Sequence, residues 1–119
     1  MCGIAGYIGS FPPALNNLKQ VSKALKHRGP NYEGYDNHKT ETSCVAMIHR
    51  RLSIIDLDER SNQPFRYKDT VLVYNGEIYN YLEIREQLRE LGHIFKTSGD
   101  TEVLIHALCQ WGQDALKKL

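Results

Sequence analysis

The chain begins MCGIAGYIG over residues 1–9, and the fold and the function both depend on how this stretch is interpreted. Its β-branched and aromatic residues, with glycines at points of close approach, predict a first strand over residues 2–8. Cys2 then has two interpretations. In the first it is a small buried apolar residue of that strand, as free cysteines usually are. In the second Met1 is removed, and Cys2 becomes the N-terminal residue that carries both a thiol and a free α-amine.

The composition is that of an ordinary globular chain. Its 119 residues fit one domain and can bury a core. The 15 Lys and Arg residues nearly balance the 14 Asp and Glu residues, so charge gives no reason to expect a nucleic acid or an acidic membrane surface as partner. The apolar runs are too short to span a bilayer, and we expect neither a signal peptide nor a membrane segment.

The cysteines do not form a recognisable framework. Cys2, Cys44 and Cys109 are widely spaced, and the sequence has no CxxC pair and no His/Cys cluster of metal-binding spacing. We therefore expect no metal site, and a reducing, cytoplasmic setting.

Hydrophobic periodicity predicts a helix and a hairpin after the first strand. Apolar residues recur at helical spacing at positions 15, 18, 21 and 25, and Gly29 followed by Pro30 ends this helix. Segments 32–38 and 43–49 predict a hairpin, with Cys44, Ala46 and Ile48 on one face of its second strand.

The second half of the chain is predicted to be mixed as well. Residues 51–57 are expected to be extended, residues 58–65 to form a loop, and residues 70–76 to form a strand that runs into an Asn-Gly turn signal. Residues 93–100 predict a further strand and then a turn. Because regular βαβ units are missing, we expect an α+β fold with an antiparallel sheet.

Two more helices are predicted by their end signals. Asn80 is the expected N-cap of the first, with Glu83 completing a capping box and Tyr79 packing on Ile84 as a hydrophobic staple. Gly92 ends it. The other helix begins at about Thr101 and ends at Gly112, and a last helical turn or two follows.

Four polar stretches have ordinary structural interpretations when they are taken one at a time. His27 and Arg28 suit a helix C-terminus, and Arg51 suits a solvated strand end. The Asn75-Gly76 pair suits a hairpin turn, and Asp100 suits a helix N-cap. The stretches are HRGP (27–30), RR (50–51), NGE (75–77) and SGD (98–100).

Taken together with Cys2, the same stretches suggest chemistry. The α-amine of an N-terminal cysteine has a pKa of about 7.7–8.0, near the thiol value of about 8.5, so it can serve as the base for the thiol. Attack of the thiolate on a carbonyl creates an oxyanion, for which the Asn75 side-chain amide and the Gly76 N–H would be two donors. An arginine and an aspartate would hold the α-carboxylate and α-ammonium of an amino acid. Glutamine, with a reactive side-chain carbonyl, is the natural candidate.

Six motifs in order make the sequence similar to a known family. The chain resembles, over essentially all of residues 1–119, the glutaminase domain of class II glutamine amidotransferases, and within them the asparagine synthetase branch. The motifs are MCGIAGYIG, HRGP, HRRLSIIDL, NQPF, YNGEIYNY and SGDTEVL.

The resemblance implies an N-terminal-nucleophile fold. This is an αββα sandwich of two antiparallel sheets between helical layers, expected here as one domain over residues 1–119. In the family the last helix leads into further strands, so we expect a truncated chain whose sandwich is incomplete at the C-terminal end. The sequence has no Ser-Gly-Gly-x-Asp-Ser pyrophosphate loop, so no synthetase domain is expected. ATP and magnesium are expected only for that domain, and no cofactor in this chain.

The resemblance also implies residue roles. Cys2 would be the nucleophile that forms a glutamyl thioester and releases ammonia, with Asn75 and Gly76 as the oxyanion hole. Arg51, rather than Arg50, would hold the carboxylate of the substrate L-glutamine. The other residues implied to bind substrate are Leu52, Ser53, Ile54, Ile55, Glu77 and Asp100, the last two at the α-amino end.

Two features leave alternatives open. Asn31 follows HRGP, where the family usually has Asp. The chain is also expected to lack strands of its domain, so either it is a fragment or truncated product, or a homo-oligomer or a synthetase-domain partner completes the sheet. The leading hypothesis is glutamine hydrolysis to glutamate and ammonia. The alternative is an inactive truncated fragment that acts as an interaction or glutamine-binding module.

Overall fold

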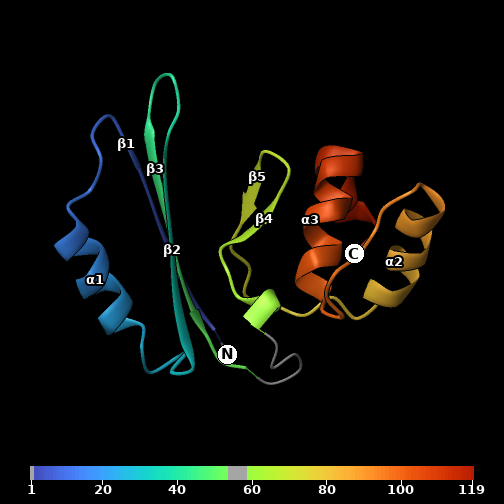
Figure 1. Ribbon diagram of the computed structural model, residues 1–119, viewed down its shortest axis with the longest axis horizontal. Coiled ribbons are helices and arrows are strands. Elements are labelled where there is room, and N and C mark those ends of the chain that lie inside the picture. Colours follow the sequence, from blue (N-terminus) through green and yellow to red (C-terminus); the bar gives the residue numbers. More distant parts are fainter. Residues whose placement is uncertain (1, 54–58) are drawn as a thin grey trace. The chain divides into compact units, whose positions relative to one another are not determined.

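The computed structural model describes residues 2–53 and 59–119, which fall into two compact units (Figure 1). Of the described residues, the first unit takes 2–53, 62–64 and 73–75. The second takes 59–61, 65–72 and 76–119. Each unit has its own sheet and its own helices, so the α+β class with antiparallel sheets is confirmed.

The first unit is a three-stranded antiparallel sheet with one helix. Its strands are β1 (Gly3–Gly9), β2 (Tyr32–Lys39) and β3 (Cys44–Arg51), in the order β1-β3-β2. The register pairs Gly3 with Arg50 and Tyr32 with Arg51. The predicted first strand and the predicted hairpin are therefore confirmed, and β3 is the central strand.

Helix α1 (Leu15–Ala24) covers one face of this sheet (Figure 1). Leu18 packs on Ala46 and Ile48 of β3, as the alternation along that strand predicts. The predicted apolar stripe of the helix is only partly right, because Leu15 and Val21 are exposed and Ser22 is buried instead. Ser22 tolerates burial because its hydroxyl donates a hydrogen bond to the Glu33 carboxylate at 2.9 Å.

The second unit packs two helices and a small hairpin together. The hairpin is β4 (Phe65–Tyr67) with β5 (Thr70–Leu72), and the helices are α2 (Tyr81–Glu90) and α3 (Asp100–Trp111). Figure 1 shows α2 and α3 side by side, with the hairpin against α3. Short 3₁₀ helices η1 (Glu59–Ser61) and η2 (Gly112–Lys117) complete the elements.

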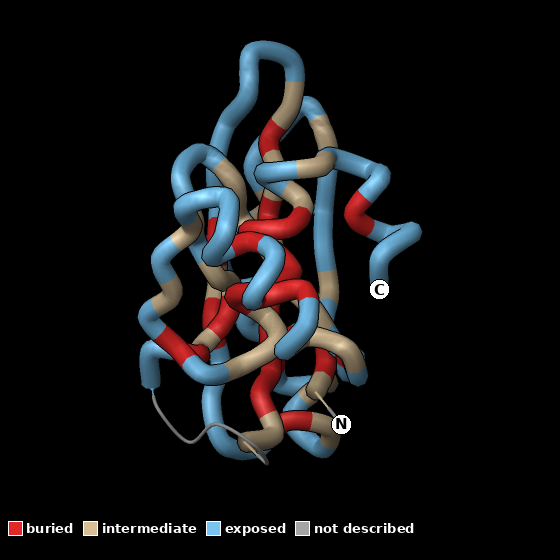
Figure 2. The backbone as a smooth tube through the Cα atoms, turned by 90° about the vertical axis from the view of Figure 1, so that its right-hand side faces the viewer, coloured by how far each residue is buried: buried red, intermediate tan, exposed pale blue. Residues whose placement is uncertain are grey.

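The core of the second unit lies between its two helices. Buried positions appear red along the chain in Figure 2. In this unit the fully buried side chains include Ile84 and Leu88 of α2 and Val103 and Ile105 of α3. Ile84 and Leu88 are four residues apart on one face of α2, whereas α3 is buried all round over residues 102–107, so apolar burial holds the pair of helices together.

Several local predictions for the second half are wrong. The predicted strand 70–76 is only Thr70–Leu72, and the predicted loop 58–65 contains η1 and the first residue of β4. Residues 93–99 form no strand, because buried charged side chains of α2 and α3 take up their backbone groups, as described below.

The helix ends also differ from their sequence signals. Asn80 is the N-cap of α2 but forms no capping bond, since its side-chain amide donates to the Lys118 carbonyl at 2.7 Å. Tyr79 is 91% exposed, which rules out the staple. Gly92 and Gly112 end their helices at positive φ of 91° and 58°, as predicted.

Among residues 2–53 and 59–119, no helix combines the length and apolar character that crossing a membrane requires.

Gly34 of β2 is expected to be the least replaceable glycine of the sheet. A Cβ there would lie 2.0 Å from the Gln63 carbonyl oxygen, a backbone atom. We expect Gly34→Ala to lower the free energy of unfolding by about 1–3 kcal/mol through overpacking. Gly6→Ala is the matched control, because its Cβ would meet only the Ala46 oxygen at an ordinary 3.6 Å. Urea unfolding measures both, and equal effects of the two variants would contradict this account.

Candidate active site

Cys2 is held at the end of β1 by groups from two other segments of the first unit. The Leu52 N–H donates a hydrogen bond to the Cys2 sulfur at 3.3 Å, and the thiol faces the Leu52 carbonyl at 3.8 Å. The Arg28 side chain donates to the Cys2 carbonyl at 3.0 Å. The thiol is half-buried rather than packed in the core. Backbone groups of Leu52 therefore fix the position of the Cys2 sulfur at the end of the sheet.

The two neighbouring arginines of β3 point to opposite faces of the sheet, as alternate residues of a strand do. Arg50 forms an ion pair with Glu33 at 2.5 Å on the face that α1 covers. Arg51 donates to the Asn62 side-chain oxygen at 2.7 Å and is buried, with 8% of its surface exposed. The interpretation of Arg51 as a solvated strand end is therefore wrong. Of these two arginines, Arg50 is therefore already paired with a carboxylate of the chain itself, that of Glu33.

A segment from later in the chain covers the face opposite α1. Gln63 lies over Gly34, and its side-chain oxygen accepts a hydrogen bond from the Tyr74 N–H at 2.5 Å. This bond places residues 73–75, with Asn75 at their end, in the same unit as Cys2. Asn75 is exposed, and α2 rather than a strand follows it, so the hairpin-turn interpretation is wrong.

The second unit holds the acidic residues of the predicted site. The Asp100 carboxylate accepts a hydrogen bond from the Ile78 N–H at 3.0 Å, which ties the start of α3 to the segment of Gly76 and Glu77. Asp100 is thus the first residue of α3 and not its N-cap, which is Gly99. Gly76 and Glu77 are exposed.

Two buried charged residues shape the loop before Asp100. Arg85 of α2 donates to the carbonyls of Thr97 and Gly99 at 2.7 and 2.8 Å. Glu102 of α3 accepts from the Lys96 N–H, and from the Thr97 N–H at 2.6 Å. These bonds satisfy the loop backbone without a sheet, which explains why the predicted strand is absent. Nothing in the sequence distinguished these two side chains from solvated helix charges.

The predicted site residues are therefore distributed over both units. Cys2, Arg51, Leu52, Ser53 and Asn75 belong to the first unit. Gly76, Glu77 and Asp100 belong to the second. Ile54 and Ile55 lie outside the described residues.

Sequence reasoning missed partners of these residues. Asn62 and Gln63 were quoted only as part of a motif, yet they bind Arg51 and the Tyr74 backbone. The sequence signal available for them was two consecutive side-chain amides, Asn62 and Gln63, just before Pro64, since such amides can hydrogen-bond both a guanidinium and a backbone N–H. The interpretation of His27 and Arg28 as residues of a helix C-terminus holds for His27, whose ring contacts the Ala24 carbonyl at the end of α1 at 2.9 Å. Arg28 instead donates to the Cys2 carbonyl.

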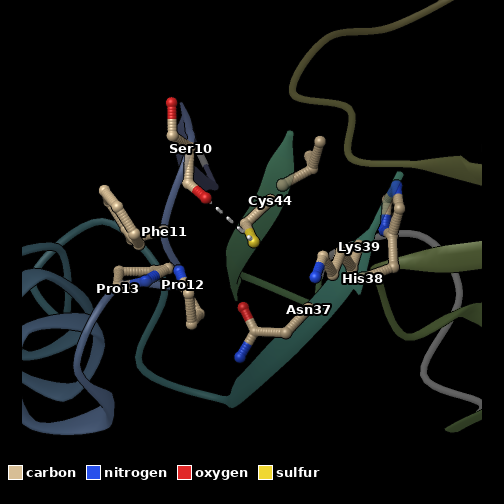
Figure 3. Close-up of a pocket in the computed structure, with 9 residues that line it drawn as sticks. Ser10, Phe11, Pro12, Pro13, Asn37, His38, Lys39 and Cys44 are labelled. Atoms are coloured by element: carbon tan, nitrogen blue, oxygen red, sulfur yellow. Dashed lines mark hydrogen bonds between the residues drawn. The ribbon is translucent and has the colours of Figure 1, made fainter. Parts of the chain in front are cut away.

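An apolar groove of about 420 Å³ lies at the other end of the three-stranded sheet (Figure 3). Phe11, Pro12 and Pro13 form one side, Asn37 and Lys39 the other, and Cys44 the floor. Cys44 pairs with Gly9, seven residues from Cys2 along β1, so the groove is separate from the Cys2 thiol. Within residues 2–53 and 59–119, no group of three or more His, Cys, Asp or Glu side chains is arranged to hold a metal.

Two buried histidines are neutral at physiological pH. Burial, together with the charge of Arg51, lowers the pKa of His49 from 6.5 to about 4. Burial likewise lowers the pKa of His106 to about 4, although Glu102 opposes the shift. His106 stacks on Tyr67 at 3.8 Å and on Phe95 at 4.5 Å between ring centroids.

The first unit thus holds the thiol of Cys2 against the N–H of Leu52, and Arg51 directly precedes Leu52. This arrangement can now be compared with known proteins. Residues 1–119 match the glutamine amidotransferase domain family. The chain belongs to this family. Membership supports the N-terminal-nucleophile type of fold expected for such a glutamine amidotransferase domain.

Curated relatives of this glutamine amidotransferase domain are glutamine-hydrolysing asparagine synthetases. Two from Bacillus subtilis (strain 168), asparagine synthetase 1 and asparagine synthetase 3, are 40% and 37% identical over the whole chain. An asparagine synthetase from Sandersonia aurantiaca is 36% identical, also over the whole chain. The chain spans only 19%, 20% and 22% of the length of these three proteins. The similarity to the asparagine synthetase branch is therefore confirmed.

The buried histidines predict how stability depends on pH. The unfolded chain binds a proton on each of them below about pH 6.5, and the folded chain does so only near pH 4. We expect the free energy of unfolding to be highest above pH 6.5 and to fall towards pH 4, by up to roughly 3 kcal/mol per histidine.

His106→Phe isolates one contribution, because phenylalanine keeps the ring stack but does not titrate. The fall in stability between pH 7 and pH 4, measured by urea unfolding, should be smaller in this variant than in the parent. Tyr67→Phe is the control, since it keeps the stack and leaves His106 in place. If all three chains gave parallel curves, His106 would not be the titrating group.

Proposed function

We propose that this chain catalyses the glutaminase half-reaction of an asparagine synthetase-like amidotransferase. The substrate is L-glutamine and the products are glutamate and ammonia. The contact of the Leu52 N–H with the Cys2 sulfur at 3.3 Å carries the proposal, because it holds the thiol of residue 2 in a fixed, half-buried place at the end of β1, where a nucleophile could meet a substrate. Family membership and the names of the relatives support the same reaction.

The reaction begins once Met1 has been removed. The free α-amine of Cys2 takes the thiol proton, and the thiolate attacks the side-chain amide carbon of glutamine. The carbonyl oxygen becomes an oxyanion, for which the Asn75 amide and the Gly76 N–H are the proposed donors. The α-ammonium returns its proton to the amide nitrogen, the C–N bond breaks, and ammonia leaves. Water then adds to the thioester, releasing glutamate and regenerating the thiol.

The remaining residues would bind the amino-acid end of the substrate. A guanidinium matches a carboxylate with two parallel hydrogen bonds, and Arg51, which is buried and donates to the Asn62 side chain, is the proposed partner of the substrate carboxylate. Leu52 and Ser53, with Ile54 and Ile55, would line the pocket beside it. Glu77 and Asp100 carry the negative charge suited to the α-ammonium.

No cofactor is needed for these steps. In the longer relatives, the names imply that glutamine hydrolysis supplies nitrogen for asparagine synthesis. We propose that the ammonia formed here serves an ATP- and magnesium-dependent synthetase domain or partner in the same way.

Intact-protein mass spectrometry with an electrophilic diazo-ketone analogue of glutamine tests the proposal. We expect a chain without Met1 to gain a single adduct, to be protected by excess glutamine, and to release ammonia from glutamine. Cys2→Ala should lose the adduct and at least 10³-fold of the rate, since it removes the nucleophile. Cys109→Ala, which removes an exposed thiol of α3, should keep both.

Two results would contradict the proposal. One is a folded, Met1-processed chain that forms no adduct and releases no ammonia, which would favour the interaction or glutamine-binding module. The other is ammonia release that survives Cys2→Ala, which would assign the activity to a contaminant.

A further inference from the structure

Gln63 connects the sheet of the first unit to the segment that carries Asn75. Its side-chain oxygen accepts a hydrogen bond from the Tyr74 N–H at 2.5 Å, and Tyr74 directly precedes Asn75 in the chain. Its backbone carbonyl lies against Gly34 of β2, so closely that a Cβ on Gly34 would be 2.0 Å from the oxygen. These four residues belong to the same unit as Cys2, the proposed nucleophile.

The segment that carries Asn75 has no regular secondary structure of its own. Residues 73–75 follow β5, and in the described part of the chain no strand ladder includes them. The bond to Gln63 therefore acts where regular pairing does not, on the peptide that joins Val73 to Tyr74. Asn75 begins at the next peptide bond, so the place of its side chain is set relative to a peptide that Gln63 holds.

Placement matters more for an oxyanion donor than for most polar groups. Such a donor lowers the barrier only when its N–H lies where the oxyanion forms, and a displacement of about 1 Å can cost about a hundredfold in rate. Asn75 is exposed, so packing in the core does not fix its position. Its position depends instead on the backbone contacts of its neighbours, of which the bond from Tyr74 to Gln63 is one.

This contact depends on the identity of residue 63. Gln63 is 7% exposed, and a buried side-chain amide is costly unless it is hydrogen-bonded. Methionine has a similar length and shape but no comparable acceptor, whereas glutamate keeps an oxygen at the same place. The hydrogen bond and the burial of this side chain can therefore be tested separately.

We propose that Gln63 is a positioning residue that places Asn75 for the oxyanion through its hydrogen bond to the Tyr74 N–H. This inference deepens the proposed glutaminase function and rests on it. Gln63 takes no part in the chemical steps and acts through Asn75.

Two substitutions at position 63 test the proposal. Gln63→Met removes the acceptor, and Gln63→Glu retains it. Gln20→Met makes the same change at an exposed glutamine of α1 and is the matched control. Three quantities are measured on each Met1-processed chain: glutaminase kcat and KM, the rate of Cys2 alkylation by iodoacetamide, and amide hydrogen exchange of Tyr74 by NMR.

We expect Gln63→Met to act on the transition state. It should lower kcat and kcat/KM together by about tenfold to a hundredfold, which is the pattern of a contact made only in the transition state. The alkylation rate should stay within about twofold of the parent, because the thiol keeps its contacts with Leu52. The Tyr74 N–H should exchange at least about tenfold faster. Gln63→Glu and Gln20→Met should each keep kcat within about threefold of the parent.

A double-mutant cycle with Asn75→Ala tests whether Gln63 acts through Asn75. Asn75→Ala removes the donor and should lower kcat by about 10²–10³. In that background Gln63→Met should lower kcat no further, because no donor remains to be misplaced. Additive losses would assign the effect of Gln63 to another part of the site and overturn the proposal.

The proposal is also overturned if Gln63→Met keeps the kcat of the parent. Should Gln63→Met fail to fold, Gln63→Asn takes its place, because its amide stays polar but withdraws the acceptor by one methylene. Parent-like kcat and Tyr74 exchange in that variant overturn the proposal as well.

The positioning role and the proposed function can fail separately. A folded, Met1-processed parent chain that releases no ammonia removes the proposed function. In that case, faster Tyr74 exchange in Gln63→Met still supports the hold of Gln63 on the segment before Asn75, and unchanged exchange overturns it. Ammonia release by the parent with unchanged kcat in Gln63→Met removes the positioning role alone.

Discussion

The central strand β3 is the constraint on which the first unit depends. It pairs with both neighbours, so its backbone is fully used and its side chains must alternate between two faces. Ala46 and Ile48 therefore meet α1, while His49 and Arg51 lie on the opposite side. The same alternation separates two adjacent arginines that would otherwise repel one another at one site. Each face then requires its own polar partners, Glu33 on one and Asn62 on the other.

The candidate catalytic thiol lies where this regular pairing ends. Beyond the Gly3–Arg50 and Tyr32–Arg51 pairs the strands separate, and their backbone groups need other partners. Arg28, Asn31 and the sulfur of Cys2 supply them. The sulfur at the strand end thus receives the Leu52 N–H, which the sheet does not use, and the charged Arg28 side chain holds the Cys2 carbonyl beside it.

The second unit solves a related problem with buried charges. Arg85 and Glu102 extend from neighbouring helices and bind the backbone of the loop between them. A buried cation and anion are costly when unpaired, but here each is hydrogen-bonded to peptide groups that would otherwise be unsatisfied. The loop that precedes Asp100 is consequently held from both sides. Asp100 then receives the Ile78 N–H, which links the loop to the segment that begins at Gly76.

The sequence by itself determined the strands and helices whose pattern is local. The hairpin of β2 and β3, the helix ends at Gly92 and Gly112 and the shared face of Ala46 and Ile48 all follow from periodicity and from glycine at positive φ. The motifs also led correctly to the glutamine amidotransferase family. They also name Arg51 rather than Arg50 as the substrate-binding arginine, and this stays a prediction.

Tertiary structure decided everything that depends on a distant partner. Residues 93–99 have strand-like residues, yet Arg85 and Glu102 take their hydrogen bonds. Asn80 has a side-chain oxygen that could cap its helix, but its side-chain nitrogen donates to the Lys118 carbonyl and no capping bond forms. Residues 2, 31 and 52 converge only because three strands end at one edge. Local propensity is worth a fraction of a kcal/mol per residue, so a long-range hydrogen bond or a buried contact overrides it.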